Sequence, residues 1–413
     1  MNLQTTDKEV FEIIEDEKKR QSEELEMIAS ENYVSEAVLE ATGSILTNKY
    51  AEGYPGARYY GGCENIDRVE TLAIERLKKL FGCKFANVQP HSGSSANMAA
   101  YTAVLEPGDR ILGQALDAGG HLTHGSKVSF SGKIYDSHFY GLDPETGRLN
   151  YDEIMKIAKE IRPKAIICGY SAYPRALDFK KFRQIADEVG AYLIADIAHI
   201  AGIIAVGLHP SPVGVADIVT STTHKTLRGP RSGIIMTNDE ELSKKINKAV
   251  FPMLQGGPLE HIIAAKAVAF GESLKPEFKK YIEEVLNNMQ VFATTLSHLD
   301  FDLVTDGTDN HLILVDLRNK DITGKEFEDL LHGAGITVNK NAVPGDPQPP
   351  KIASGIRVGV AALTSRGMGI VEMQRIGELF NKVLENKNNP AILEEIKEEV
   401  RVMCKKFPVP GIN

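Results

Sequence analysis

Short apolar runs that alternate with helical segments constrain the fold of this chain more than any other feature. Residues 165–168, 192–195, 218–221 and 233–237 are expected as buried strands, and residues 179–189 have the periodicity of a helix. Buried runs of this length, separated by helices, are typical of a largely parallel sheet with crossover connections. We therefore predict an α/β fold of the kind that binds its ligands at the carboxyl ends of parallel strands.

The organisation of the chain changes on both sides of this α/β region. A chain of 413 residues is too long for one ordinary core. Residues 8–27 read as an exposed, highly charged helix, whereas a long helix (281–299), strands at 312–316 and 356–359, a helix at 324–332 and two final helices follow Pro276. We predict an N-terminal helical arm (1–45), a large domain with a mostly parallel sheet (46–276) and a smaller α+β domain (277–413).

Composition excludes several classes of protein. The net charge of -9 argues against a protein that binds a nucleic-acid backbone, which would need a basic face. No apolar run approaches the length that spans a bilayer, and the charged N-terminus lacks the apolar core of a signal peptide. Four cysteines without a Cys-x-x-Cys pair favour reduced, buried thiols. We expect a cytoplasmic protein that binds neither nucleic acid nor membrane.

Two charged residues follow predicted strands. Lys225 lies just after one strand, among hydroxyl residues and near a glycine, where a partly desolvated amine could form a Schiff base. Asp196 ends another strand, where it could keep a pyridine nitrogen protonated. Taken alone, Lys225 would more often be a surface lysine, and Asp196 would equally well be the N-cap of a helix.

A third segment changes the balance between these readings. Residues 91–97, His-Ser-Gly-Ser-Ser-Ala-Asn, open a predicted helix of small residues. Free backbone N–H groups, hydroxyl donors and the helix dipole make such a start a candidate phosphate cradle. A cradle, then an aspartate, then a lysine is the chain order used by aspartate-aminotransferase-like pyridoxal-phosphate enzymes. The order is much more specific than any one of the three segments.

Several longer motifs resemble one family of such enzymes. They are Tyr-Ala-Glu-Gly-Tyr-Pro-Gly-Ala-Arg-Tyr-Tyr-Gly-Gly (50–62), Gly-Gly-His-Leu-Thr-His-Gly (119–125), Ser-Thr-Thr-His-Lys-Thr-Leu-Arg-Gly-Pro-Arg (221–231) and Gln-Gly-Gly-Pro-Leu-Glu-His (255–261), with shorter matches at 31–33, 308–311 and 338–341. The chain resembles the serine hydroxymethyltransferase family from about residue 26 to residue 367. The resemblance implies an aspartate-aminotransferase-like fold.

The resemblance also assigns roles to individual residues. Those implied to hold pyridoxal 5′-phosphate are Lys225 (covalently), Asp196 (ring nitrogen), His199 and Ser171 (ring oxygen or the aldimine region), Ser94, Ser95 and His224 (phosphate), and Tyr50 and Gly257 (phosphate, from a neighbouring subunit). Those implied to act on substrates are Arg357 and Ser30 (amino-acid carboxylate), Glu52, Tyr60, Thr222 and His121 (catalysis), and Leu116, Gly120, His121, Leu122, Tyr59 and Asn341 (pterin). Without the family pattern, Arg357 would read as an edge-strand surface charge.

The implied activity is reversible transfer of the serine hydroxymethyl group to a tetrahydropterin, which gives glycine and the methylene-tetrahydropterin. The resemblance also implies homodimers with shared active sites, which could pair into tetramers. One alternative is a threonine-type aldolase without a pterin, and another is a non-catalytic scaffold. A metal site is not expected, because His121 and His124 have no apparent third ligand in the sequence.

The identity of the tetrahydropterin that accepts the hydroxymethyl group depends on a single position in the sequence. Lys351 stands where the family generally has an aromatic ring against its folate. Loss of the ring removes apolar contact, and a flexible cation suits a different or acidic tail. We therefore predict tetrahydromethanopterin, rather than tetrahydrofolate, as the leading candidate for the carrier. The alternative is that the aliphatic stem of the lysine covers the same surface.

Overall fold

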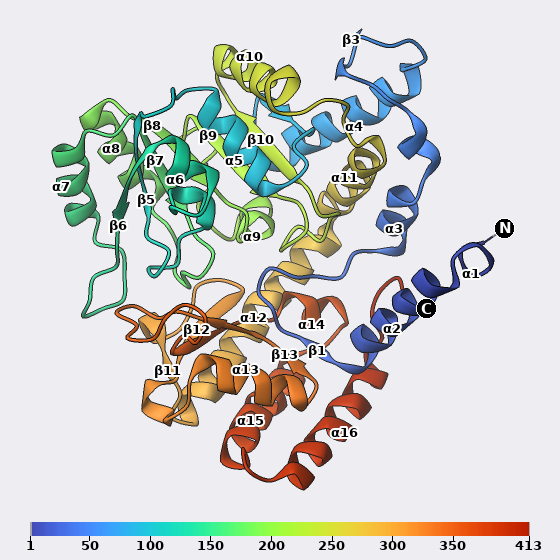
Figure 1. Cartoon of the computed structure of the whole chain (residues 1–413), viewed down its shortest axis with the longest axis vertical. Coiled ribbons are helices and arrows are strands. Elements are labelled where there is room, and N and C mark those ends of the chain that lie inside the picture. The colour runs from blue at the N-terminus through green and yellow to red at the C-terminus, as the bar shows by residue number, and fades with distance from the viewer. Residues whose placement is uncertain (1, 413) are drawn as a thin grey trace. The chain divides into compact units, whose positions relative to one another are not determined.

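The structure is a computed structural model and describes residues 2–412 (Figure 1). Two compact units account for the packing: residues 37–283, and residues 1–36 together with 284–413. The N-terminal segment thus groups with the C-terminal part of the chain. The three-part division with boundaries at 45 and 276 stays a prediction. In the described part of the chain, no helix is both long and apolar enough to cross a membrane.

The larger unit contains a seven-stranded sheet, which confirms the predicted α/β fold with a mostly parallel sheet. Its strand order is β4-β10-β9-β8-β7-β5-β6. The strands are β4 (Phe85–Asn87), β5 (Arg110–Gln114), β6 (Asp136–Tyr140), β7 (Ala165–Gly169), β8 (Tyr192–Asp196), β9 (Ile218–Thr222) and β10 (Gly233–Thr237). Strands β9, β8, β7, β5 and β6 pair in parallel, whereas β10 is antiparallel to both β9 and β4. The carboxyl ends of β8 and β9 therefore meet at one edge of the sheet.

Helices connect and cover these strands. They are α4 (Glu64–Phe81), α5 (Gly93–Thr102), α6 (Phe130–Ile134), α7 (Tyr151–Ile161), α8 (Phe179–Val189), α9 (Ala201–Ala205), α10 (Glu240–Lys248) and α11 (Glu260–Ser273). Helix α5 packs on β9 and β10, and α8 packs on β7 and β8 (Figure 1). Fully buried isoleucines at 111, 167, 194 and 218 form the core with α5. Burying a side chain of this size contributes about 1.5–3 kcal/mol.

The start of the larger unit includes α3 (Glu36–Thr42) and a short hairpin, β2 (Gly53–Tyr54) and β3 (Ala57–Arg58). Gly53 has φ +102, and a side chain there would meet the Ala57 carbonyl, so the hairpin requires glycine at this position. Helix α4 ends at Gly82 in the left-handed conformation (φ +69), where a glycine closes the helix without strain.

The smaller unit contains a four-stranded antiparallel sheet in the order β11-β12-β15-β14. Its strands are β11 (Asp302–Leu303), β12 (Leu312–Asp316), β14 (Asn339–Asn341) and β15 (Gly355–Gly359), and β1 (Leu25–Glu26) pairs with β13 (Ile336–Thr337). Its helices are α1 (Leu3–Thr6), α2 (Lys8–Glu23), α13 (Gly324–Gly333), α14 (Ala361–Ser365), α15 (Ile370–Glu385) and α16 (Pro390–Lys406). Helix α12 (Pro276–His298) runs from one unit into the other. Helix α2 contains no buried residue, as its charged sequence indicated.

Candidate active site

Asp196 lies at the carboxyl end of β8 and is surrounded by donors. Its Oδ2 accepts hydrogen bonds from Asn97 Nδ2 (2.8 Å) and His124 Nε2 (3.1 Å), and its Oδ1 accepts from the Ala198 N–H (3.0 Å). Burial would raise the pKa of Asp196, but the hydrogen bond and charge of His124, together with His121 and Asn97, hold it well below its ordinary value. The structure therefore keeps this carboxylate ionised in a site from which water is largely excluded.

The donors to Asp196 belong to a continuous network. Thr220 Oγ1 on β9 donates to Asn97 Oδ1 (2.6 Å), and Asn97 Nδ2 donates to Thr123 Oγ1 (2.8 Å) as well as to Asp196. Thr123 Oγ1 in turn lies 2.7 Å from Nδ1 of His121, which also accepts from the Thr123 N–H. The network links His121, a predicted catalytic residue, to the carboxylate through Thr123 and Asn97.

Three members of this network, Asn97, Thr123 and Thr220, carried no role in the sequence interpretation. The available signal was that Asn97 is polar in a helix of small residues packed on a sheet. His124 also gains a role. Its Nδ1 faces the backbone N–H of His121 (3.3 Å), so the proton is assigned to Nε2, the atom that donates to Asp196.

Lys225 lies in a tight turn after β9 and is 8% exposed. The turn is closed by hydrogen bonds from the Gly229 N–H to the Thr223 carbonyl (2.7 Å) and from the Arg228 N–H to the Lys225 carbonyl (3.1 Å). Thr226 Oγ1 donates to the backbone carbonyl of His199 (3.0 Å). This bond fixes the turn to the loop that follows Asp196. A buried amine is thus held beside the segment that carries the buried carboxylate.

The candidate phosphate cradle begins α5. Ser92 caps the helix: its Oγ accepts from the Ser95 N–H (3.1 Å), and Ser95 Oγ accepts from the Ser92 N–H (2.8 Å). Ser95 thereby takes part in a capping box, while Ser94 is exposed. A side chain at Gly93 would lie 2.6 Å from Thr222 Cγ2, so the cradle and the end of β9 approach closely enough to require glycine.

His224 supplies an independent indication that an anion belongs here. Its Nδ1 is buried and, within residues 2–412, has no hydrogen-bond partner. Burial, with the charges of Lys225 and Arg231, lowers the pKa of His224 to about 3. A buried polar atom left without a partner is costly, and a phosphate oxygen would satisfy it. The orphaned nitrogen, the cradle, the buried lysine and the ionised aspartate fit pyridoxal phosphate.

A second loop places the predicted pterin contacts Gly120, Leu122 and Leu116. Gly120 has no room for a side chain, because a Cβ would lie 2.1 Å from the Gln114 carbonyl oxygen. Ser171 is tied to the same loop, since its N–H donates to the Gly119 carbonyl (2.7 Å). Leu116 and Leu122 are 47% and 44% exposed, which leaves apolar surface beside His121.

Tyr50, Glu52, Tyr60 and Gly257 come together in a separate cluster. Tyr50 Oη donates to Glu52 Oε1 (3.2 Å), Tyr60 Oη donates to Glu52 Oε2 (3.3 Å), and the two tyrosine rings meet edge to face. A side chain at Gly257 would lie 2.8 Å from the Tyr50 ring. The charge of Glu52 raises the pKa of Tyr60, so that its hydroxyl stays a donor. Both tyrosines are about half exposed, and the ring of Tyr59 packs edge to face on Phe251.

The smaller unit carries Arg357, Asn341 and Ser30. Arg357 lies on β15, between β12 and β14, and its Nη2 donates to Asn339 Oδ1 (3.2 Å). Burial lowers the pKa of Arg357 to about 10. Because β15 is an inner strand, the arginine is not the edge-strand surface charge that its residues alone suggested. Asn341 donates to the Ala342 carbonyl (2.8 Å), Ser30 is partly buried, and Lys351 is exposed.

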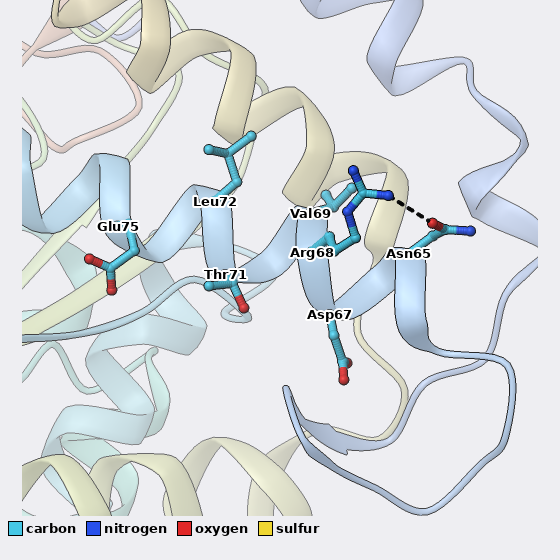
Figure 2. Close-up of a pocket in the computed structure, with 7 residues that line it drawn as sticks. All are labelled: Asn65, Asp67, Arg68, Val69, Thr71, Leu72 and Glu75. Carbon is cyan, nitrogen blue, oxygen red and sulfur yellow. Dashed lines mark hydrogen bonds between the residues drawn. The ribbon is translucent and has the colours of Figure 1, made fainter.

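A pocket elsewhere contains none of the predicted site residues. Figure 2 shows its lining side chains, all from α4: Asn65, Asp67, Arg68, Val69, Thr71, Leu72 and Glu75. Arg68 Nη1 donates to Asn65 Oδ1 (3.3 Å) across one turn of the helix. The hollow follows the outer face of the helix and brings no catalytic group together.

The structure supplies a third potential metal-ligating group beside His121 and His124. Ligand atoms of these two histidines and of Asp196 lie within 4.8 Å of one another. No local pattern pointed to this carboxylate as a partner, because it lies 72 residues from His124 along the chain. The same carboxylate already accepts a hydrogen bond from His124, however, and the hydrogen-bond network accounts for all three positions. The absence of a resident metal stays a prediction.

Comparison with known proteins gives a consistent result. A family model described as serine hydroxymethyltransferase matches residues 3–380. Proteins named serine hydroxymethyltransferase from a Nitratiruptor species, Helicobacter pylori and Wolinella succinogenes are 58%, 57% and 58% identical to the chain. Each alignment covers 407 residues, which is 98% of this chain and 98% of the relative.

Proposed function

The chain belongs to the serine hydroxymethyltransferase family, and we propose from this membership that it transfers the hydroxymethyl group of serine reversibly to a folate carrier. It is a pyridoxal-phosphate-dependent enzyme whose other product is glycine. Full-length relatives that share one printed name, serine hydroxymethyltransferase, favour this activity over a pterin-free aldolase and a non-catalytic scaffold. That name does not favour the tetrahydromethanopterin predicted from the sequence as the carrier. The exposed position of Lys351 agrees with a lysine whose head lies in water.

The observation that best supports this site as the cofactor site is that the carboxylate of Asp196 is buried and kept ionised. Pyridoxal phosphate, when bound, supplies an electron sink for the electron pair released when a bond to the Cα of the amino acid breaks. That property requires a protonated ring nitrogen, and an ionised carboxylate is the group that holds such a proton. Three hydrogen-bond donors keep Asp196 ionised.

Other residues have chemistry that suits the roles proposed for them. Lys225 is buried in a rigid turn, where its amine can hold the cofactor covalently. The proposed phosphate donors are His224, Ser94 and Ser95. Glu52, which accepts hydrogen bonds from Tyr50 and Tyr60, would move a proton at the serine hydroxyl or at the carrier. Arg357 would bind the amino-acid carboxylate with its two parallel N–H groups, assisted by Ser30.

Two strand-associated aspartates provide a matched test of the role of Asp196. Asp217 directly precedes β9 and accepts hydrogen bonds from Arg183 Nη1 (2.8 Å) and the Leu193 N–H (2.7 Å), at the opposite edge of the sheet. Asp196→Asn should abolish most serine cleavage while the protein stays folded, whereas Asp217→Asn should retain activity in proportion to its folded fraction. Equal activity of the two variants would overturn the assignment of Asp196.

We also propose that the active site is shared between the subunits of a homodimer. The half-exposed Tyr50, with Glu52 and Gly257, forms a cluster that a partner's cofactor could reach. Mixing inactive Lys225→Ala with inactive Tyr50→Phe should restore some activity through hybrid sites. Hybrids that form but stay inactive would refute shared sites. The further pairing into tetramers and the cytoplasmic location stay predictions.

A further inference from the structure

Lys266 on α11 is a buried cation whose hydrogen-bond acceptors are backbone carbonyls. The residue is 1% exposed. Its Nζ donates to the carbonyl oxygens of Val88, Pro90 (3.3 Å) and Gly233 (2.8 Å). Within residues 2–412 it forms no ion pair closer than 4 Å. A lysine is almost never fully buried without a counterion, so this arrangement calls for an explanation.

The number of acceptors indicates the protonation state. An ammonium has three N–H donors, whereas a neutral amine has two, so three carbonyls match the charged form. Burial lowers the pKa of Lys266 to about 7, and the charges of Glu70 and Glu260 oppose that effect. A phosphate dianion nearby would favour the ammonium further.

The three carbonyls lie past the end of the β4–β10 pairing, between that pairing and the start of α5. Strands β4 and β10 pair only as far as Asn87 and Ile235. Beyond that point, the Gly233 N–H (3.2 Å) and Ser232 Oγ (2.9 Å) both donate to the Pro90 carbonyl. Lys266 thus donates to backbone carbonyls that lie past the last β4–β10 pair, where the chain leaves β4 and enters the cradle.

The same carbonyls adjoin the first residues of the cradle. A side chain at Gly233 would lie 2.2 Å from the Ser92 carbonyl oxygen, so β10 passes directly beneath the residue that caps α5. The charge of Lys266 also acts on His91, the first residue of the cradle segment, because burial and then Lys266 lower the pKa of His91. The ammonium thus contributes both to the shape of the cradle and to its electrostatic potential.

We propose that Lys266 is a positioning residue for the phosphate group of the cofactor, acting through the three carbonyls that set the shape of the cradle and through its own positive charge. The inference rests on the proposed function, because it takes the start of α5 as the phosphate site. It differs from a general role in stability in one respect. Its effect should appear only with a ligand that carries the phosphate.

The test compares pyridoxal phosphate with pyridoxal, which lacks the phosphate. Apoenzyme made from the holoenzyme is titrated with each ligand, and binding is followed by the visible absorption of the bound compound. Lys266→Met keeps the length of the side chain and removes all three donors. It should weaken binding of pyridoxal phosphate about tenfold or more, because the carbonyls of Val88, Pro90 and Gly233 each lose the donor that Lys266 supplies, while affinity for pyridoxal changes less than about twofold.

Two further variants separate the proposed role from a general effect on folding: one is a control, and the other is a second test. Arg76 on α4 donates from Nη1 to the carbonyl of Ala267, the next residue on α11 (2.6 Å), so Arg76→Met removes a cation that contacts the same helix and should leave the ratio of the two affinities unchanged. Ser232→Ala removes a different donor to the Pro90 carbonyl and should lower the ratio to a smaller extent, even if Lys266→Met does not fold.

The outcomes separate the inference from the proposed function. Equal losses for the two ligands in Lys266→Met and Ser232→Ala, or no loss in either variant, would overturn the positioning role. Failure of the unmodified apoenzyme to bind pyridoxal phosphate would instead overturn the proposed cofactor site.

Discussion

Arg58→Met should be among the most damaging single substitutions outside the reacting groups. The Arg58 side chain is 4% exposed and pairs with Asp67 (2.8 Å) and Glu70 (2.6 Å) on α4. Its Nη1 also donates to the carbonyls of Ala51 and Gly53, both at 2.9 Å. These bonds fix the hairpin that separates Tyr50 and Glu52 from Tyr60.

The magnitude follows from what the substitution leaves behind. Glu70 is 1% exposed, and its other hydrogen bond comes from Gln89 Nε2 (2.8 Å). Removing one partner of a buried ion pair costs about 3–5 kcal/mol, because a charge stays buried without compensation. Burial already raises the pKa of Glu70 against the opposing effect of Arg58. In the variant, Glu70 should take up a proton, and the loss of stability should grow as the pH rises.

The assay is urea unfolding of the apoenzyme, with a double-mutant cycle. Asp67→Asn serves as the matched control, because this carboxylate is 28% exposed and an exposed pair contributes only about 0–1 kcal/mol. Adding Glu70→Gln to Arg58→Met should recover part of the lost stability, since it removes the unpaired charge. A loss below about 1 kcal/mol for Arg58→Met, or a double variant that loses the sum of the two single effects, would refute the reasoning.

Three further predictions concern other groups. Burial, with the charge of Glu70, raises the pKa of Glu260 to about 8, so the contribution of Glu260 to stability is full below about pH 4.5 and is lost as the pH rises towards 8. Glu260→Gln should therefore flatten the fall of the melting temperature between about pH 5 and 8, and an unchanged slope would contradict this prediction. Arg357→Ala should weaken glycine binding by tens- to thousands-fold, from a cost of about 2–5 kcal/mol, while the absorption of the bound cofactor survives; normal glycine binding would place the carboxylate site elsewhere. Lys351→Phe should leave a preference for tetrahydrofolate unchanged in serine cleavage compared at equal carrier concentrations, whereas faster cleavage with tetrahydromethanopterin in the unmodified enzyme would restore the prediction made from the sequence.

Local patterns explain why much of the fold was predictable. The strands ending near Asp196 and Lys225 are short apolar runs, and the helix at 64–81 ends at a glycine, so their periodicity and punctuation are visible in the sequence. The phosphate cradle, the aspartate and the lysine follow β4, β8 and β9, which run in the same direction in the sheet. The topology therefore brings them to one edge without any information about distant side chains.

The parts that could not be predicted depend on contacts far apart in the sequence. Asn97 meets Asp196 across 99 residues, and Lys266 meets Val88 across 178. In the sequence, Arg58 resembles a surface residue of a turn, and Lys266 resembles a solvated helix lysine. Only the packing of α4 and α11 buries them. Polar residues that position a site are therefore harder to predict from the sequence than the site residues that they position.

The identity of the cofactor-bearing lysine tests the central claim most directly. The structure buries two lysines within residues 2–412, Lys225 and Lys266. Borohydride reduction of the holoenzyme, followed by peptide mapping, should place the pyridoxyl group on Lys225 alone. A pyridoxyl group on Lys266 or on any other lysine, or its absence from every peptide, would contradict the account.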